Sequence, residues 1–453
     1  MISGAVINVK DFGAIGDYDE VTLAGTNDTV AIQAAIDAAA ALPRKGAVYI
    51  PSGWYKITTA LQIPYGVSIF GAGGTASIIY AANCNGLEFT TYGYELGSMF
   101  FEDFGVTSAG GANRIAVYTA PNASTMDGLY FSRMRLYGFN KGFVLASNWN
   151  CTIQQCVITE VNAAIELGSG NGQSIGIRIL NNRMSRSIGG NGDAPPVGIN
   201  AADTTQFNES VHIAFNQIFG FSRNITLGKA YYSTIFDNDL SGSGDVISFT
   251  TPEGGYNISN NFIEVRGSGT GIFGAPQSLP TPNTRTIITS NAFVGLDTAQ
   301  HGIKLGGEGG QQQNAVIRDN TFVGFQINDI RLTGAGITGA TLIDSNRCMS
   351  TAASLSIFVF DVATPLVVIT NNYLVKALTL NVAQDYQNGK VIIANNIENN
   401  TFQSNKSEAT PVTGTWRITD IVYNSTPATG EYIGWVCTVA GTPGTWKPFG
   451  LIA

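Results

Sequence analysis

Apolar and polar residues alternate along most of the chain around a motif of the form Ile-x-x-Asn-x-apolar, which recurs nine times. The asparagines of these motifs are Asn182, Asn216, Asn238, Asn261, Asn291, Asn320, Asn346, Asn372 and Asn396. They lie 22 to 34 residues apart, and a period in the twenties with variable insertions is typical of a solenoid whose turns stack. Alternation within each unit indicates strands rather than helices. The sequence therefore predicts a parallel β-helix with a ladder of stacked asparagine side chains.

A second periodic column supports this interpretation. Short apolar triplets precede the asparagine motifs: Phe143–Leu145, Ile165–Leu167, Ile199–Ala201, Ile225–Leu227, Ile247–Phe249, Ile303–Leu305 and Ile330–Leu332. Their outer residues are expected to point inward and the middle residue outward, because side chains alternate along a strand. Each turn is thus expected to hold one strand from this column, a loop, and one strand that leads into the asparagine turn.

The first 75 residues differ from this pattern. Residues 30–42 are predicted to form an amphipathic helix, with Asn27, Asp28 and Thr29 supplying N-cap oxygens. Its apolar stripe consists of Ile32, Ala35, Ile36 and Ala39. A single helix before a solenoid is expected to cover the open first turn. We expect residues 1–75 to form this cap and the first strands, residues 76–403 the β-helix, and residues 404–453 a small β segment.

Composition narrows the possible partners and compartments. The net charge of −8 and the absence of basic clusters argue against binding to nucleic acid or to an anionic membrane. Five scattered cysteines form no disulfide framework or metal motif, so they are expected to be reduced core residues. No run of 18 apolar residues and no basic start followed by an apolar stretch occur. We therefore expect no membrane insertion and no signal peptide.

Three stretches near the N-terminus carry a family resemblance. They are Asp11–Asp17, Asp28–Ile36 and Gly46–Tyr55, and together they closely resemble the opening of the pectate-lyase-like superfamily as found in bacteriophage tailspikes. The segment Tyr18–Thr26 departs from the family by making the usual link longer. Near the C-terminus, the stretch Gly434–Trp446 resembles the closing segment of many tail fibres and tailspikes.

The resemblance implies an all-β fold: a right-handed, single-stranded parallel β-helix with an N-terminal capping helix and a small C-terminal β domain. It also implies a homotrimer in the tail of a virion, synthesised in the host cytoplasm and acting at the bacterial surface. Such proteins bind, and usually depolymerise, a capsule, exopolysaccharide or O-antigen. Tailspikes commonly begin with a virion-binding head, whereas this chain starts directly at the capping helix. We therefore expect either that the head lies outside the given sequence or that a virion adaptor protein holds the chain. No cofactor or metal is expected.

Hydrolysis of a glycosidic bond needs two carboxylates. The predicted catalytic candidates share one flank of the coil: Glu166, Asp203, Glu209 and Glu253. The predicted substrate-binding residues are Arg178, Asn200, His212, Thr226, Ser248 and Lys229. A long insertion, Ser187–Asn208, falls beside them, and long loops on one flank of a solenoid usually shape its binding face. If none of the four carboxylates acts, the site is expected at a subunit boundary near Asp239 and Glu264.

Two alternatives remain open. A polysaccharide lyase would use a base such as His212 to abstract a proton beside a uronate carboxylate, with Arg178, Lys229 or Arg266 neutralising that carboxylate. A protein of another class, a non-enzymatic adhesin, would only hold the glycan. The sequence does not identify the sugar or the linkage.

Two outward columns change from polar to apolar in the C-terminal half of the coil. In the strands entering the asparagine turn the apolar members are Ile287, Val316, Leu342, Val368 and Ile392; just after the turn they are Val294, Val323, Met349 and Val375. Such a surface is too large for a soluble monomer to leave wet. We therefore expect subunits to meet here, with the segment from about Thr410 onward, containing Trp416, Trp435 and Trp446, locking the chains together.

Overall fold

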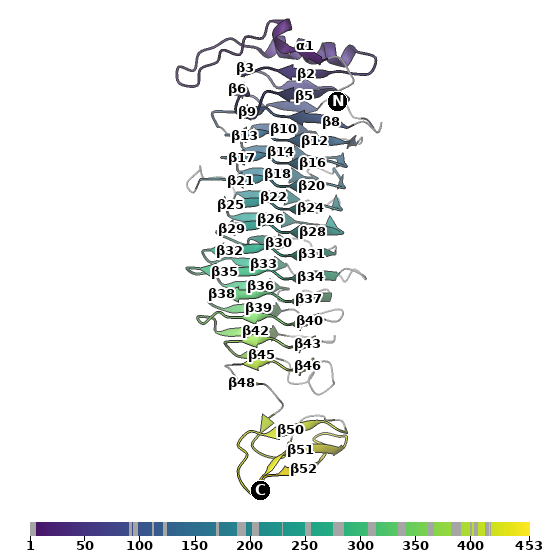
Figure 1. Ribbon diagram of the computed structural model, residues 1–453, viewed down its shortest axis with the longest axis vertical. Helices are drawn as coiled ribbons and strands as arrows, with labels where there is room; N and C mark the ends of the chain where they lie inside the picture. Colours follow the sequence, from purple (N-terminus) through teal and green to yellow (C-terminus); the bar gives the residue numbers. More distant parts are fainter. Residues whose placement is uncertain are drawn as a thin grey trace. The chain divides into compact units, whose positions relative to one another are not determined.

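The structure is a computed structural model that describes residues 6–89, 93, 98–110, 113–120, 125–168, 172–187, 196–201, 208–228, 230–249, 255–274, 285–306, 314–333, 341–360, 367–381, 391–398, 401–402, 406–412, 416 and 418–453. The chain divides into two compact units, residues 1–275 with 296–299 and residues 276–295 with 300–453. In both, short parallel strands stack in successive turns, so the predicted parallel β-solenoid is confirmed (Figure 1).

Each full turn contributes a strand to each of three sheets. Sheet 1 contains the predicted first column, sheet 2 the strands that enter the asparagine turn, and sheet 3 the strands that leave it. The sequence analysis predicted only two strands per turn and treated the residues after the asparagine as an outward column. The strands of sheet 3 were not predicted, because many of them are only three residues long. Such a strand places a single side chain inward, as β21 does with Met184, and one apolar residue gives no visible alternation.

In the first unit the sheets have the following members. Sheet 1 contains β4 (Leu61–Ile63), β7 (Leu87–Phe89), β10 (Ile115–Thr119), β14 (Lys141–Leu145), β18 (Ala163–Leu167), β22 (Val197–Ala201), β26 (Arg223–Leu227), β30 (Ile247–Phe249) and β33 (Thr270–Gly274). Sheet 2 contains β1 (Val6–Asn8), β2 (Ala47–Ile50), β5 (Ser68–Gly71), β8 (Met99–Glu102), β12 (Leu129–Ser132), β16 (Thr152–Gln154), β20 (Arg178–Leu180), β24 (His212–Ala214), β28 (Ser233–Phe236) and β31 (Tyr256–Ser259). Sheet 3 contains β3 (Gly53–Ile57), β6 (Ser77–Ala81), β9 (Gly105–Thr107), β13 (Arg135–Tyr137), β17 (Val157–Thr159), β21 (Arg183–Ser185), β25 (Gln217–Phe221), β29 (Asp239–Gly242) and β32 (Phe262–Arg266). A short sheet 4 contains β11 (Met126–Asp127), β15 (Asn148–Trp149), β19 (Ser174–Ile175), β23 (Asn208–Glu209) and β27 (Ala230–Tyr231).

The second unit continues the same three-sheet pattern. Sheet 1 contains β36 (His301–Leu305), β39 (Asn328–Thr333), β42 (Leu355–Phe360) and β45 (Leu378–Asn381). Sheet 2 contains β34 (Arg285–Thr289), β37 (Asn314–Arg318), β40 (Thr341–Asp344), β43 (Val367–Thr370) and β46 (Val391–Ala394). Sheet 3 contains β35 (Ala292–Leu296), β38 (Thr321–Val323), β41 (Arg347–Cys348), β44 (Tyr373–Leu374), β47 (Ile397–Glu398) and β48 (Thr401–Phe402).

The predicted asparagine ladder is confirmed between sheets 2 and 3. In the first unit the side-chain amide of Asn182 donates to the Oδ1 atom of Asn216 at 3.0 Å, and Asn216 donates to Asn238 at 2.9 Å. In the second unit Asn320 donates to Asn346 at 3.0 Å. All nine asparagines are buried, so each bond satisfies polar atoms that cannot reach water.

The residue before each ladder asparagine adopts a left-handed backbone conformation. Its φ is +55° at Asn181, +60° at Phe215, +51° at Asp237 and +57° at Asn260. Asparagine and aspartate tolerate this conformation better than most residues, whereas a bulky residue such as Phe215 is unusual there. The left-handed residue makes the sharp corner that directs the following strand into sheet 3.

The predicted N-terminal helix is present as α1 (Thr29–Ala41) and its four-residue apolar stripe is buried. It packs on β1, β2 and β4 (Figure 1). The capping differs in detail from the prediction, because the backbone amide of Thr29 donates to Asn27 Oδ1 at 3.1 Å. The carboxylate of Asp28 instead accepts from the backbone amides of Ile15 at 2.7 Å and Gly16 at 3.0 Å, and so anchors the preceding turn. A short 3-10 helix, η1 (Val9–Phe12), precedes this turn.

The last part of the chain forms a separate four-stranded sheet. Its strands are β49 (Lys406–Ser407), β50 (Ile421–Asn424), β51 (Tyr432–Val439) and β52 (Thr445–Leu451). Val422, Cys437 and Trp446 form its small core, with Trp416 and Trp435 packed against them. The expected small C-terminal β segment is therefore present.

The five cysteines are all free, and four of them are buried, as expected. Burial raises the pKa of the half-buried Cys84 thiol to about 11, so it is not a reactive thiolate at neutral pH. Within the described residues, no helix has both the length and the apolar character needed to cross a membrane.

Candidate functional site

The structure places four of the predicted residues in one column of sheet 1. Glu166, Asn200, Thr226 and Ser248 occupy matching positions on successive strands β18, β22, β26 and β30, as the alternation predicted. Thr226 and Ser248 are only 2% and 3% exposed and hydrogen-bond to each other at 3.2 Å. The predicted substrate-binding residues of this column are therefore not all accessible, because Thr226 and Ser248 are buried.

The carboxylate of Glu166 already has a cationic partner. Its Oε2 atom lies 2.7 Å from Nζ of Lys141, which is on the neighbouring strand three residues before the partner of Glu166, and the Glu166 side chain is 13% exposed. This ion pair fixes the position of the Glu166 carboxylate on the sheet. Glu209 is half-buried in β23 of the separate sheet 4, so the two carboxylates lie in different sheets.

Arg178 and His212 are paired across β20 and β24 of sheet 2. His212 Nδ1 lies 2.8 Å from the Thr234 hydroxyl oxygen. Burial, and secondarily the nearby Arg178 guanidinium, lowers the pKa of His212, so its imidazole is neutral at neutral pH. The remaining candidates, Asp203, Glu253 and Lys229, lie outside the described residues.

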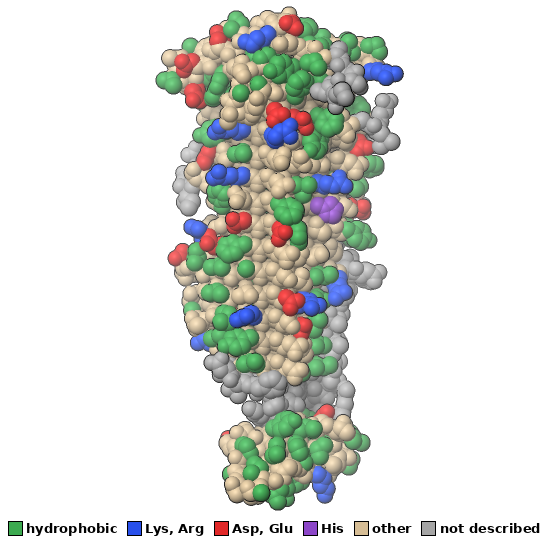
Figure 2. Space-filling model, viewed as in Figure 1, with side chains coloured by type: hydrophobic (Ala, Val, Ile, Leu, Met, Phe, Trp, Pro, Cys, Tyr) green, Lys and Arg blue, Asp and Glu red, His purple; other side chains and the backbone are tan. Residues whose placement is uncertain are grey.

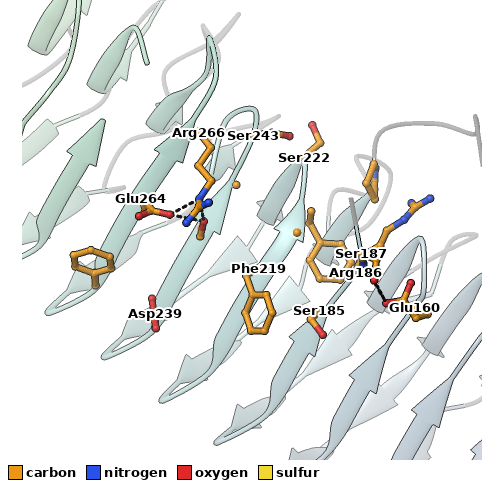
Figure 3. A pocket seen from close by; sticks show the side chains of 16 residues that line it. Glu160, Ser185, Arg186, Ser187, Phe219, Ser222, Asp239, Ser243, Glu264 and Arg266 are labelled. Atoms are coloured by element: carbon orange, nitrogen blue, oxygen red, sulfur yellow. Dashed lines mark hydrogen bonds and ion pairs between the residues drawn. The ribbon is translucent and has the colours of Figure 1, made fainter. Parts of the chain in front are cut away.

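A different group of residues lines an open pocket of about 970 Å³ on sheet 3 of the first unit (Figure 3). Strands β21, β25, β29 and β32 form its floor, and the residues that follow these strands form one wall. We call this pocket the sheet 3 groove. It contains three carboxylates, Glu160, Asp239 and Glu264, and two arginines, Arg186 and Arg266.

Asp239 and Glu264 lie diagonally across two neighbouring strands. Asp239 pairs with Phe262, and Ser241 pairs with Glu264, so the two carboxylates are offset by two residues and face the same side (Figure 3). A strand spacing of about 4.8 Å and two rises of about 3.3 Å place their Cα atoms about 8 Å apart. Carboxylates about 6.5–9.5 Å apart leave room for a water molecule between acid and base.

The two carboxylates have different surroundings. Glu264 Oε1 accepts from Ser241 Oγ at 2.8 Å and forms an ion pair with Arg266 Nε at 2.5 Å. Arg266 Nε also lies 3.1 Å from Ser241 Oγ, which closes a three-membered cluster. The Glu264 side chain is 17% exposed, whereas Asp239 is exposed in the groove. A fixed carboxylate beside a free one is an arrangement that acid–base chemistry can use.

Aromatic rings flank this pair. Phe219 on β25 and Phe262 on β32 lie on either side of the strand that carries Asp239, and Phe262 is 44% exposed. Apolar ring faces exposed beside polar groups are common features of ligand sites. At the other end of the groove, Glu160 accepts hydrogen bonds from the backbone amide of Ser187 at 3.1 Å and from its hydroxyl at 2.6 Å.

A glycine allows the wall of the groove to form. Gly220 has φ of +80°, and a Cβ atom there would lie 1.9 Å from the carbonyl oxygen of Arg186. Only glycine permits both this backbone conformation and this approach. The close approach brings the end of β25 against the segment that carries Arg186 and Ser187.

The sequence analysis named Asp239 and Glu264 as a fallback location for the site, but it did not predict that they share a groove on one sheet. A sequence signal for this groove exists. The residues one and three positions after each ladder asparagine point outward in sheet 3, so they can be listed from the sequence. After Asn238 these are Asp239 and Ser241, and after Asn261 they are Phe262 and Glu264. The sequence analysis considered only the residues three positions after each asparagine, so it did not include the column that contains Asp239. No group of three or more His, Cys, Asp or Glu side chains able to hold a metal occurs in the part of the chain that the structure describes.

Comparisons with known proteins agree with the family resemblance of the N-terminal sequence. Residues 6–93 match the family described as Rhamnogalacturonase A/epimerase, pectate lyase-like. The chain is 24% identical over 368 residues to the tail spike protein of Shigella phage Sf6, covering 76% of this chain and 55% of that protein. It is 40% identical over 86 residues to the capsule K3-specific depolymerase 1 of Klebsiella phage KP32, covering 17% of this chain and 10% of that protein.

A mutant of DFA-IIIase from Arthrobacter chlorophenolicus A6 has a similar solved structure, with a TM-score of 0.53 at 13% identity, covering 82% of this chain and 95% of that one. At this identity the likeness concerns the fold alone. The chain spans about half the length of the tail spike protein and a tenth of the depolymerase. The resemblance to phage tailspikes and depolymerases with a pectate-lyase-like fold is confirmed.

Proposed function

We propose that this protein is a phage tailspike depolymerase that binds a bacterial surface polysaccharide and hydrolyses it within the chain. The observation that carries the proposal is the diagonal pair Asp239 and Glu264 in an open groove floored by aromatic rings. An endo-acting enzyme needs a groove open at both ends, and a site on the outer face of a solenoid sheet meets that need. The tail spike and capsule depolymerase relatives support the substrate class.

The proposed mechanism assigns one role to each carboxylate. Glu264, held in its ion pair with Arg266, takes the proton from a water molecule as that water attacks the anomeric carbon. Asp239 gives a proton to the departing glycosidic oxygen. In such an inverting reaction the water molecule lies between the base and the sugar, and the two carboxyl groups are about 6.5–9.5 Å apart.

The carboxylates predicted on the other flank are a second possible location for the chemistry. Glu166 and Glu209 would serve there with Asp203 and Glu253, and Arg178 or Asn200 would contact the glycan. We favour the sheet 3 groove because Glu166 in β18 and Glu209 in β23 lie in different sheets. In the groove, by contrast, Asp239 is exposed beside a second carboxylate.

We also propose that the protein is a homotrimer in a phage tail and that an adaptor protein is a partner there. In the second unit Ile287, Val316, Leu342, Val368 and Ile392 are in register along sheet 2, as predicted. Ile392 of this stripe and Val323 of the neighbouring stripe in sheet 3 are each 46% exposed, whereas Val316 is buried, so the predicted apolar surface is only partly uncovered in one chain. Covering it with another copy would remove that surface from water.

The test is to incubate the protein with purified capsule and O-antigen from a panel of bacterial strains and to analyse the products. New reducing ends without the ultraviolet absorbance of an unsaturated uronate are expected for hydrolysis. Reducing ends with that absorbance would assign the protein to the lyases instead. Polysaccharide binding without fragments from any bound strain would assign it to the non-enzymatic adhesins.

A further inference from the structure

The sheet 3 groove continues toward the N-terminal cap through two more pockets. A pocket of about 440 Å³ shares Ser185 with the groove, and a further pocket of about 450 Å³ shares Thr75 and Arg135 with that one. All three lie on sheet 3 within the first unit. They cover its strands from β3 to β32, eight strand spacings or about 38 Å.

One outward column runs along these pockets from β13 to β29. Successive strands place Arg135, Val157, Arg183, Gln217 and Asp239 in register. Two strand spacings therefore separate Arg135 from Arg183, and two more separate Arg183 from Asp239, about 10 Å in each case. The column thus carries two cations at a regular interval that leads to the proposed catalytic pair.

These two arginines have no acidic partner among the described residues. Arg183 is exposed and its guanidinium lies 5.4 Å from the centre of the Phe219 ring, while Arg135 is half-buried. Nearby Arg133 shows the usual alternative, because its Nε and Nη2 atoms donate to the two carboxylate oxygens of Asp103, both at 2.7 Å. Acidic residues outnumber basic ones by 32 to 24 in this chain, and charged side chains are sparse on the face seen in Figure 2. Unpaired arginines aligned in one groove are therefore not a by-product of a basic surface.

The charge along the groove is also polarised. Its end near β29 and β32 holds the free carboxylate of Asp239, because Glu264 is paired with Arg266. The part near β13 and β21 holds the free arginines, with Glu160 hydrogen-bonded to Ser187 on one side and Glu20 in the pocket nearest the cap. A negatively charged substituent would be repelled from the first region and attracted to the second. A guanidinium can donate two parallel hydrogen bonds to a carboxylate or a phosphate group.

We propose that Arg135 and Arg183 are subsites for anionic substituents, and that the substrate is an acidic polysaccharide with such groups at regular intervals. This inference rests on the proposed function of the groove as the polysaccharide site. The two arginines fix the direction and the register of the chain, so that a neutral sugar lies between Asp239 and Glu264. The anionic group is a carboxylate or a phosphate, two groups that share this recognition chemistry.

The first arm of the test uses polymers that do not depend on the natural substrate. Binding of fluorescently labelled polygalacturonate, polyphosphate and neutral dextran would be measured at low salt with the whole protein and with an Arg135→Gln/Arg183→Gln double variant. We expect the protein to bind at least one anionic polymer and not dextran, and the double variant to bind roughly 10- to 100-fold more weakly. The anionic polymer that binds more tightly distinguishes carboxylate from phosphate.

The matched control is Arg347→Gln. Arg347 is an exposed arginine of sheet 3 in β41 and lines none of the three pockets. We expect its binding to equal that of the unmodified protein. If the double variant binds no more weakly than Arg347→Gln, or if the unmodified protein binds neither anionic polymer, the proposal is overturned.

The second arm separates this inference from the proposed function. A bacterial polysaccharide that the protein binds would be compared with the same material after chemical reduction of its carboxylates or removal of its phosphates. Loss of binding after this treatment, without cleavage of the untreated polymer, would retain the anionic subsites and reject the hydrolase. Equal cleavage of treated and untreated polymer would retain the hydrolase and reject the subsites.

Discussion

The side-chain amide of Asn216 donates to Asn238 Oδ1 at 2.9 Å, and the backbone amide of Asn216 donates to the same oxygen at 3.0 Å. Asn238 in turn donates to the carbonyl oxygens of Ile213 at 2.9 Å and Phe236 at 3.0 Å. One side chain thus satisfies backbone groups of its own corner and of the preceding turn. The ladder therefore fixes both the corner and the stacking of one turn on the next.

Replacing Asn238 by alanine would leave several buried polar groups without partners. We expect Asn238→Ala to lower the free energy of unfolding by about 3 kcal/mol or more, because each unsatisfied buried group costs about 1–3 kcal/mol. Thermal unfolding of the variant measures this loss. The control Asn257→Ala removes an exposed asparagine of β31 and should leave the melting temperature unchanged. Equal melting temperatures for the two variants would mean that the ladder does not stabilise the coil.

The exposed apolar stripe of the second unit gives a prediction about assembly. We expect a Val323→Asp/Ile392→Asp double variant to dissociate into monomers, because each site is 46% exposed and a carboxylate there cannot be buried against another copy. Sedimentation velocity compares the variant with the unmodified protein, for which we expect the mass of a trimer. Val30, which is 79% exposed in α1, gives the matched control Val30→Asp, which should sediment like the unmodified protein. A double variant that still sediments as a trimer would exclude this surface as the interface.

A buried carboxyl group makes stability depend on pH. Asp329 in β39 is fully buried, and burial raises its pKa to about 7, against the opposing influence of the Ser350 and Ser356 hydroxyls. Between its ordinary pKa of 3.8 and about 7, the folded protein holds a proton that the unfolded chain releases. The free energy of unfolding contributed by this group therefore falls as the pH rises through that range.

Asp329→Asn removes this dependence. We expect the variant to unfold at a higher temperature than the unmodified protein at about pH 8 and at nearly the same temperature at about pH 4. Thermal unfolding across this range gives the comparison. Asp319→Asn, an isosteric change at an exposed carboxylate, should show no such difference. A gain that is the same at both pH values would contradict the assignment to Asp329.

Much of the fold could be predicted because the inward-facing residues repeat. The ladder asparagines and the isoleucine before each one form a column that only a stacked coil explains, and the apolar stripe of α1 required a partner surface. The corner residues were not predicted. Phe215 has no sequence signal for a left-handed conformation, since its φ of +60° is set by the turn around it.

The candidate site was harder to predict, because outward residues carry no such constraint. Thr226 and Ser248 point outward by the alternation rule, yet both are buried. Alternation along a strand predicts the direction of a side chain but not whether other parts of the chain cover it. The ion pair of Glu166 with Lys141 could not be predicted from the sequence, because it joins neighbouring strands whose paired residues are 22 positions apart in the chain. Asp239 and Glu264 were visible one by one, yet their diagonal relation depends on the register of sheet 3.

The most direct test of the account is the turnover of four variants on a polysaccharide that the unmodified protein cleaves. We expect Asp239→Asn and Glu264→Gln to lower the release of reducing ends by roughly 10²–10⁴-fold while binding to the polysaccharide persists. Glu166→Gln and Glu209→Gln should retain full turnover. The opposite result, full activity in both groove variants and loss in Glu166→Gln or Glu209→Gln, would contradict the sheet 3 groove as the active site and place it on the other flank of the coil.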